Sequence, residues 1–466
     1  MRCLVVLLAA CGSHAGAAAD AGDAAAADAC TAPAYDVSLA ERMAHDTSAN
    51  PAYDRAHFAA NFGSATWISQ AGATIAVDPD RADMSLNPVT PGHVSSVDVH
   101  TLIPSRPDLR WFAHSVPWFK PGGGNHIDIG IDSNSDAYVA AMIEDMKRRG
   151  FDGVVVDWYG QNSYEDLATR RMQAYLDAHP QLAFSLILMM DKGIANLSAS
   201  VLEQQIAYVD QQYFHDPHYE REGGKPILMF FGVEAVLGAT AMAQVKAATG
   251  NAQVWVVQGA GSLASAWVDQ SFDWSHDYHD GPSATDPYDL AGVAAYYAAI
   301  GKTAKQAFGS LSAGFDGTLT RTVSWSQGKY LPRGDGACLV RWAATIDGVI
   351  PANVTRMQWV TWSDWEEGTA VEPGVESAIA LAAAIDGDHL AWTVSGGGGE
   401  PTIDHYEIYA TEDGERAALV ASVAAGTHEL PLASLPCGLA GDAELVVIAV
   451  GKPMIRDHAS APVALQ

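Results

Sequence analysis

The chain has 466 residues, of which 48% are hydrophobic and 17% are charged, a composition typical of globular proteins and not of disordered ones. It carries 26 basic against 55 acidic residues, and the formal net charge of −29 repels nucleic acid and anionic membrane surfaces. The composition therefore excludes nucleic acid as an expected partner, and the length allows one large α/β barrel with a smaller second domain.

The first residues have the pattern of a bacterial export signal. Arg2 supplies the positive charge, and residues 5–10 form a short apolar segment. Leu8-Ala-Ala-Cys11 resembles a bacterial lipobox, which implies that residues 1–10 are removed and that Cys11 is lipidated. A plain secretory signal is the alternative. Since the apolar segment is too short to span a bilayer, we expect a cell-envelope protein that is lipid-anchored or secreted, with the lipid as its one link to a membrane.

The segment after this signal divides into a tether and a lead-in. Residues 11–34 are mostly Ala, Asp and Gly, which bury no core, so a flexible tether is expected. Residues 35–110 show mixed signals, with two possible strands at 62–68 and 71–77, and are expected to pack on the domain that follows.

Three of the five cysteines remain after the signal and the lipidated position are set aside. Cys30, Cys338 and Cys437 allow one disulfide in an oxidising compartment, and the sequence does not determine the pair. The chain contains no Cys-x-x-Cys and no Cys/His spacing typical of a metal site, so no metal or other cofactor is expected.

Apolar strand-like runs alternate with amphipathic helices over residues 111–385. Strands are expected at 111–119, 153–158, 182–190, 226–231, 253–257, 271–274, 307–313 and 357–362. A helix is expected after each strand, the last of them at 376–385. Eight such units over about 275 residues predict a (β/α)₈ barrel. A doubly wound open sheet would need a switch-point motif, and no Gly-x-Gly-x-x-Gly follows the first strand.

The sequence pattern changes at residues 386–466, where short runs alternate apolar and polar residues. Ala391-Trp-Thr-Val394 and His405-Tyr-Glu-Ile-Tyr409 are two of these runs. Their spacing predicts a small all-β sandwich behind the barrel. The Trp followed by a Tyr-x-Ile-Tyr strand resembles fibronectin type III domains.

Acidic and aromatic residues follow the predicted barrel strands, at the end where barrels of this kind place their active sites. The densest group is Thr361-Trp-Ser-Asp-Trp-Glu-Glu-Gly368, in which three carboxylates stand among two tryptophans. Indole faces can stack on sugar rings, and carboxylates can bind hydroxyls or transfer protons. Glycoside hydrolysis needs one protonated and one ionised carboxyl group, and close negative neighbours keep one of a pair protonated. The pattern therefore indicates a glycan-cleaving site.

The candidate residues fall into two sets. The candidate catalytic carboxylates are Asp157, Asp191, Glu234, Asp364 and Glu367. The candidate sugar-binding residues are His114, Trp118, Trp158, Tyr159, Trp274, Asp277, Trp362 and Trp365. Structural alternatives are that Asp157 caps a helix, that Asp191 caps a turn with Lys192, that Glu234 complements a helix dipole and that His114 is a core histidine. The cluster at residues 276–280 suggests a metal, but a hydrogen-bonding loop is the favoured interpretation because the spacing is not a zinc signature.

Five segments resemble motifs of known glycosidases. They are Phe112-Ala-His114, residues 152–160, residues 184–191, Gly224-Lys-Pro226 and the segment 361–368. Through these motifs the chain resembles glycoside hydrolase family 71, the endo-α-1,3-glucanases, and more distantly the family 99 endo-α-mannosidases. The likeness covers roughly residues 111–373 and implies an endo-acting barrel enzyme that cleaves an α-linked polysaccharide, an α-glucan or an α-mannan, without a metal.

The resemblance implies catalytic roles for Asp191, Asp364 and Glu367, which occupy matched positions. The chain also departs from the family pattern: Glu234 stands farther behind its strand, and Glu366 replaces the usual Gly of the last motif. Because of these departures, a glycan-binding lipoprotein with a degenerate barrel is the alternative to an enzyme. A metal-dependent hydrolase that uses the 276–280 cluster is a third hypothesis.

Overall fold

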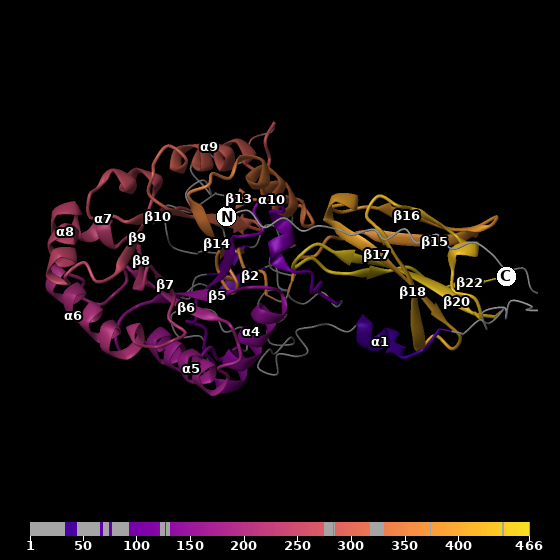
Figure 1. The fold of residues 1–466 in the computed structure, drawn as a ribbon, viewed down its shortest axis with the longest axis horizontal. Coiled ribbons are helices and arrows are strands. Elements are labelled where there is room, and N and C mark those ends of the chain that lie inside the picture. Colours follow the sequence, from indigo (N-terminus) through magenta and orange to yellow (C-terminus); the bar gives the residue numbers. More distant parts are fainter. Residues whose placement is uncertain are drawn as a thin grey trace, which may run out of the picture.

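Eight parallel strands close into the barrel of the larger domain (Figure 1). The strands are β4 (Arg110–Ser115), β5 (Gly153–Trp158), β6 (Ser185–Asp191), β8 (Lys225–Phe231), β9 (Val254–Gln258), β10 (Gln270–Phe272), β11 (Ala307–Ser312) and β14 (Val354–Val360). The barrel closes where β14 pairs with β4. The computed structural model describes residues 33–43, 66–68, 74–76, 93–121, 126, 131–274, 283, 285–316, 330–372, 374–439 and 442–465. All eight predicted strands and the barrel are confirmed.

Side chains of the barrel strands alternate between the interior and the surrounding helices, as the two-residue period of a strand requires. Phe112, Val155 and Ile187 belong to the cluster that fills the interior. Val154, Val156 and Trp158 on β5 belong instead to the larger cluster between strands and helices. This alternation decides which residues near a strand end can face the site.

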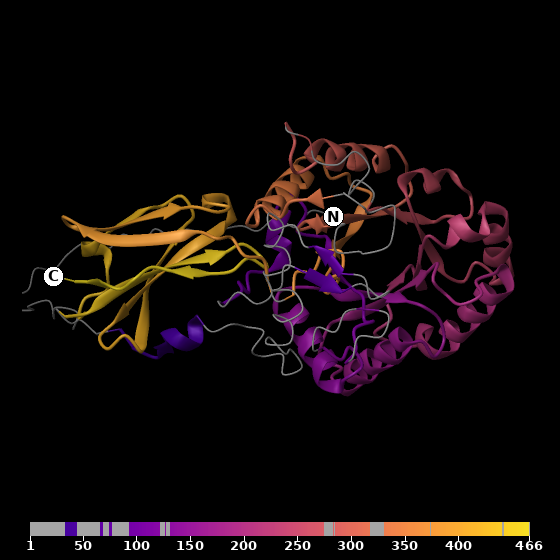
Figure 2. The same ribbon diagram turned by 180° about the vertical axis from the view of Figure 1, so that it is seen from behind.

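Helices surround the barrel, as both ribbon views show (Figures 1 and 2). They are α4 (Asp136–Arg148), α5 (Tyr164–Ala178), α6 (Ala199–Val209) with the π-helical turn η5 (Asp210–Phe214), α7 (Val233–Leu237), α8 (Ala239–Ala248), the 3₁₀ helix η6 (Ala260–Ala264), α9 (Leu290–Ile300) and α10 (Ala337–Val349). Ser135 caps α4 by accepting a hydrogen bond from the Tyr138 N–H.

The helix expected at residues 376–385 is wrong. Ala380–Asp386 forms strand β15, which pairs antiparallel with β16 (His389–Ser395) in the C-terminal domain. The Ala-rich run favours a helix by propensity, but Leu381, Ala383 and Ile385 lie at a spacing of two and pack on the core of that domain. The β domain therefore begins ahead of residue 386.

The β domain contains two antiparallel sheets that share one core. One sheet has the order β15-β16-β19 (Glu429–Pro431). The other has the order β1-β18-β17-β20-β21, with β22 also paired to β20; the bounds are β1 (Val37–Ser38), β17 (Ile403–Thr411), β18 (Arg416–Ala424), β20 (Glu444–Gly451), β21 (His458–Ala459) and β22 (Val463–Ala464). Trp392 and Tyr406 meet between the sheets with ring centroids 5.2 Å apart.

The lead-in segment divides between the two domains. Its first part supplies β1, which pairs with β18, and α1 (Leu39–Arg42), which follows directly. Arg42 forms ion pairs of 2.8 Å with Glu407 and 2.7 Å with Asp457. The 3₁₀ helix η4 (Val99–Leu102) packs instead on the outer cluster of the barrel. Between them, β2 (Thr66–Ile68) and β3 (Thr74–Ala76) pair as an antiparallel hairpin at the two possible strands.

Several predicted N-terminal features lie outside the described residues, namely the signal, Cys11 and nearly all of the tether. Cys30 also lies outside them, while Cys437 is disulfide-bonded and Cys338 is free and buried. Within the described ranges, no helix is both long and apolar enough to cross a bilayer.

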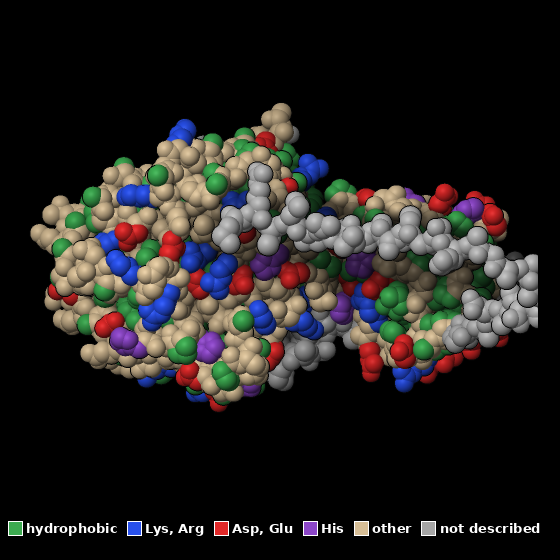
Figure 3. All heavy atoms as spheres, viewed as in Figure 1, with side chains coloured by type: hydrophobic (Ala, Val, Ile, Leu, Met, Phe, Trp, Pro, Cys, Tyr) green, Lys and Arg blue, Asp and Glu red, His purple; other side chains and the backbone are tan. Residues whose placement is uncertain are grey.

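A buried ion network closes the end of the barrel where the strands begin. Glu220, which is 3% exposed, accepts hydrogen bonds from Arg356 at 2.9 and 3.1 Å and also from Arg110. A further nitrogen of Arg356 donates to Glu222 at 2.7 Å, and the short strand β7 (Arg221–Glu222) holds this carboxylate by pairing with β8. On the face drawn in Figure 3, basic and acidic side chains are likewise intermixed over the barrel.

Replacing Arg356 with Ala is expected to lower the free energy of unfolding by about 3–5 kcal/mol, because Glu220 stays buried with too few partners. Urea unfolding followed by circular dichroism measures the change. The control is Arg171→Ala, which breaks an exposed ion pair with Asp136 and is expected to cost less than about 1 kcal/mol. Equal costs for the two variants would contradict a structural role for this network.

Candidate active site

The candidate carboxylates converge at the end of the barrel where the strands finish. Asp157 lies in β5 and Asp191 ends β6, while Glu234 opens α7 directly after β8. Asp364 and Glu367 lie in the loop that follows β14. Because parallel strands all finish on the same side, five carboxyl groups from four chain segments reach one face.

Asp157 is an enclosed member of this group. Its side chain is buried, and its Oδ1 atom makes no hydrogen bond with the described residues. Burial raises its pKa well above the usual range, and the charges of Asp191, Glu165 and Asp364 raise it further, while the nearby Tyr159 hydroxyl opposes them. The electrostatic contact shows that carboxyl groups from β5, β6 and the last loop share one environment.

Asp191 lies between an acidic and a basic neighbour. Burial raises its pKa to about 6, and the charge of Glu165 adds to the increase. The Gly193 N–H donates a hydrogen bond to Oδ1 and the Lys192 ammonium lies nearby, so both oppose that increase. Asp191 is therefore mostly ionised at neutral pH but close to its titration point.

Lys192 supplies positive charge to several of the carboxylates. Its ammonium lies 5.6 Å from the centre of the Phe231 ring, a cation–π contact. The same charge partly offsets the burial that raises the pKa of Glu234 and of Glu367. Gly232, at φ +67°, leaves room for this side chain, because a Cβ atom there would lie 2.8 Å from Lys192 Cδ.

The loop after β14 is folded around Asp364. The Asp364 N–H donates to Thr361 Oγ1 at 2.8 Å, and Asp364 Oδ1 accepts the Glu367 N–H at 2.9 Å. The Asp364 carbonyl accepts the N–H groups of Thr369 and Ala370 at 3.1 and 3.0 Å. These bonds fix the positions of the two carboxylates relative to each other.

Asp364 and Glu367 both have raised pKa values. Burial raises the pKa of Asp364 well above its usual range, and the charges of Glu367 and Glu366 add to the effect. Burial of its carboxyl group also raises the pKa of Glu367 to about 7, with a further contribution from Glu366. Glu367 keeps some exposed surface, whereas Asp364 is 4% exposed. Glu367 thus titrates near neutral pH and is better placed to meet a ligand.

Glu234 lies in the first turn of α7, where its charge is favourable to the helix dipole. Its Oε2 atom is buried without a hydrogen bond to the described residues, and burial raises its pKa. Glu234 therefore complements the helix dipole and also adds a buried carboxyl group to this end of the barrel.

Three of the predicted sugar-binding aromatic residues lie around the carboxylates. Trp118 meets Tyr159 edge to face with ring centroids 6.1 Å apart. Trp274 donates its indole N–H to Gln358 at 3.0 Å and remains partly exposed. His114 lies 4.6 Å from the Trp274 ring and is 1% exposed, and burial lowers its pKa to about 3. The neutral, enclosed His114 matches the core alternative and does not match a sugar ligand.

The structure contradicts the sugar-binding roles of Trp158, Trp362 and Trp365. Trp158 faces the helices because of the strand alternation, donates to Asp166 at 3.1 Å and is fully buried. Trp362 is fully buried with its ring edge-on to Phe151, and Trp365 is 2% exposed. None of these indoles offers a face to a ligand, because each packs in the layer outside the barrel strands.

The remaining candidate, Asp277, lies outside the described residues, as does the whole 276–280 cluster. Among the residues that the structure does describe, no group of three His, Cys, Asp or Glu side chains could hold a metal ion. The prediction for Asp277 therefore stays a prediction.

Sequence reasoning missed two members of the site. Glu165, in the first turn of α5, is 8% exposed and raises the pKa of both Asp157 and Asp191. The sequence signal for Glu165 is that it follows the second barrel strand closely and lies two residues after Ser163, which caps α5. His126 pairs with Glu366 at 3.0 Å, and no nearby motif marked it.

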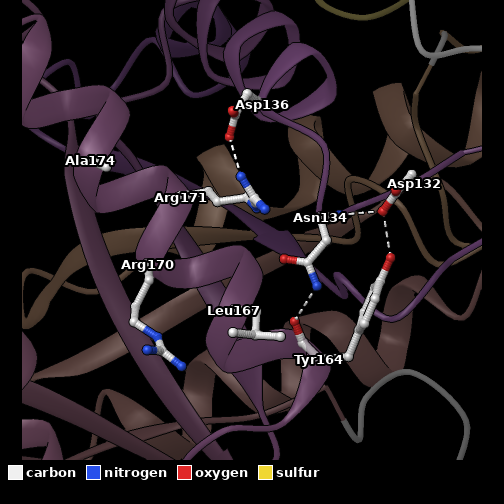
Figure 4. Close-up of a pocket in the computed structure, with 8 residues that line it drawn as sticks. All are labelled: Asp132, Asn134, Asp136, Tyr164, Leu167, Arg170, Arg171 and Ala174. Carbon is white, nitrogen blue, oxygen red and sulfur yellow. Dashed lines mark hydrogen bonds and ion pairs between the residues drawn. The ribbon is translucent and has the colours of Figure 1, made fainter.

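A surface hollow of about 520 Å³ lies between α4 and α5 (Figure 4). Most of its polar side chains are paired with one another: Arg171 with Asp136, the Tyr164 hydroxyl with Asp132, and the Asn134 amide N–H with the Tyr164 carbonyl. None of the five candidate carboxylates lines it, so this hollow is separate from the acidic group.

No family model matches the sequence, and a comparison with curated proteins finds no match. Solved structures show remote similarity. The GH99 endo-alpha-mannosidase from Bacteroides thetaiotaomicron is 15% identical, with a TM-score of 0.45 over 57% of this chain and 87% of that one. A structure described as a glycoside hydrolase is 9% identical, with a TM-score of 0.35 over 69% and 88%. At these values, any functional proposal has to rest on the residues of the site itself.

Replacing Glu367 with Gln is expected to stabilise the protein at pH 8 by about 1–2 kcal/mol and to change little at pH 4. The folded state holds the Glu367 proton up to about pH 7, whereas the unfolded chain releases it at a lower pH. The wild-type protein therefore loses stability as the pH rises through this window, and the variant does not. Urea unfolding at both pH values measures the difference; the exposed Glu203→Gln is the control, and an equal pH dependence in all three proteins would contradict the raised pKa.

Proposed function

We propose that the protein is a glycoside hydrolase that cleaves an α-linked glycan, either an α-glucan or an α-mannan, at internal bonds. The observation that carries this proposal is the group of carboxyl groups at one end of the barrel, whose pKa values are raised by burial and by one another. Raised and mutually dependent pKa values are what acid–base cleavage of a glycosidic bond requires. The α linkage and the internal attack rest on the motif resemblance alone.

The two groups suited to proton transfer are Glu367 and Asp191. Glu367, with a pKa near 7, keeps a large protonated fraction at neutral pH and in that form can donate a proton to the leaving oxygen. Asp191, with a pKa near 6, is mostly ionised there and is stabilised in that form by the Gly193 N–H and Lys192. It is the candidate ionised partner. The pKa values of Asp157 and Asp364 are raised well above the usual range, so these residues favour the protonated form and are suited to donate hydrogen bonds and fix the geometry.

Aromatic residues beside the carboxylates supply the apolar contacts that sugar rings need. Trp118, Tyr159 and Trp274 each remain partly exposed next to the acidic group. Their rings can pack on the apolar faces of pyranoses while the carboxylates bind hydroxyl groups. The glycan is therefore proposed to lie across these three rings.

The placement in the cell is a separate proposal. The lipobox-like Leu8-Ala-Ala-Cys11 supports an envelope protein that is lipid-anchored or secreted. The β domain, with its resemblance to fibronectin type III, would then serve as a spacer beside the catalytic barrel. Metabolic labelling with a fatty acid analogue in a bacterial host, with Cys11→Ser as the control, tests the anchor.

Glu367→Gln and Asp191→Asn are each expected to lower kcat by about 10²–10⁴-fold, because each removes a proton-transfer group. Release of oligosaccharides from a panel of α-glucans and α-mannans measures the activity, and Glu203→Gln should match the wild type. Full activity in both site variants would refute the assigned roles. Release of monosaccharides alone would refute internal attack.

The alternative is a glycan-binding protein with a degenerate site, and the burial of Trp362, Trp365 and His114 favours it over a fully formed sugar-binding face. Tight glycan binding with no product across the panel would support this alternative. Loss of activity in the presence of a chelator would instead favour the metal-dependent hydrolase that uses residues 276–280.

A further inference from the structure

Glu366 is held in place by side chains from another part of the chain. Its Oε2 atom lies 3.0 Å from His126 Nδ1. The His126 ring stacks on Trp118 with centroids 4.6 Å apart and an interplanar angle of 8°, and it meets Phe119 edge to face. The contact with the stacked imidazole therefore restrains the Glu366 carboxylate, whose side chain is 13% exposed.

The position of Glu366 places its charge beside the two acids of its own loop. The Glu367 N–H is bonded to Asp364 Oδ1, so the backbone from Asp364 to Glu367 is compact and Glu366 cannot move far from either neighbour. Its charge adds to the proton affinity of both Asp364 and Glu367. The positive charge of Lys192 acts on Glu367 in the opposite sense to Glu366, and it acts in the same way on Asp191 and Glu234.

We propose that Glu366, held by His126 and the Trp118 ring, is a positioning residue whose negative charge keeps Glu367 protonated for catalysis. The proposal rests on the proposed glycosidase function and adds a residue to it. Glu366 does not touch the glycosidic bond; it acts through Glu367, in opposition to Lys192. The resemblance supports a role particular to this chain, because Glu366 stands where the family motif has Gly.

The test is the pH profile of kcat/KM, in which the basic limb reports the group that must stay protonated. Glu366→Gln keeps the size of the side chain and removes its charge, so the basic limb is expected to move to lower pH by about one unit. Glu366→Asp keeps the charge and should leave the limb within about 0.3 units of the wild type. Lys192→Met removes the opposing charge, so the limb is expected to move to higher pH. The exposed Glu203→Gln is the matched control for removal of a carboxylate.

A role limited to packing would lower activity at every pH without moving the basic limb, and that result would overturn the proposal. A shift in the same direction for Glu366→Gln and Lys192→Met would overturn it as well. Circular dichroism of each variant identifies any that fail to fold, and if Glu366→Gln is one of them, Glu366→Asp and Lys192→Met still give different predictions: no shift of the basic limb for the first and a shift to higher pH for the second.

A second measurement does not depend on turnover. In protein labelled with ¹³C at glutamate carboxyl carbons, the signal missing from Glu367→Gln identifies Glu367, and its chemical shift is followed against pH. The Glu367 titration midpoint is expected to fall by about one unit in Glu366→Gln. A wild type without activity on any glycan would refute the proposed function, whereas an unchanged midpoint would refute the role of Glu366, so the two failures are distinguishable.

Discussion

The arrangement of this protein depends on one electrostatic constraint: several carboxyl groups share a space from which water is largely excluded. Each group taken out of water resists ionisation, and each ionised neighbour makes the next ionisation harder. The pKa values of Asp157, Asp191, Asp364 and Glu367 are therefore set jointly and not residue by residue. The closed barrel maintains this condition, because its parallel strands hold the acids together whether or not the acids repel one another.

The two ends of the barrel differ in how their buried carboxylates are paired. Where the strands begin, Glu220 and Glu222 are matched by arginines in close ion pairs. Where the strands finish, the carboxylates outnumber the nearby Lys192, and backbone N–H groups hold only part of their oxygens. An end with paired charge suits stability, and an end with unpaired charge suits proton transfer, at the expense of stability. The contrast supports a catalytic role for the second end.

The sequence was sufficient for the barrel because eight apolar runs bounded by turns leave few other folds. It failed at residues 376–385, where alanine favours a helix but the partner strand β16 decides the outcome. Asp157 lies with the other carboxyl groups whereas Trp158 faces the helices, because adjacent residues of a strand face opposite sides and the sequence does not say which side is which. Glu165 and His126 could not be recognised, since their roles arise from contacts between segments far apart in the chain.

The pairing of β1 with β18 joins the start of the chain to a strand near its end, and the bond from Arg42 to Glu407 spans 365 residues. Such a contact cannot form during synthesis until β18 (Arg416–Ala424) has left the ribosome. The barrel can fold earlier from local βα units, so β1 stays unpaired while the barrel is already folded. The β domain is therefore completed only after β18 has been synthesised. A nascent chain arrested before β18 would hold a folded barrel with β1 unpaired.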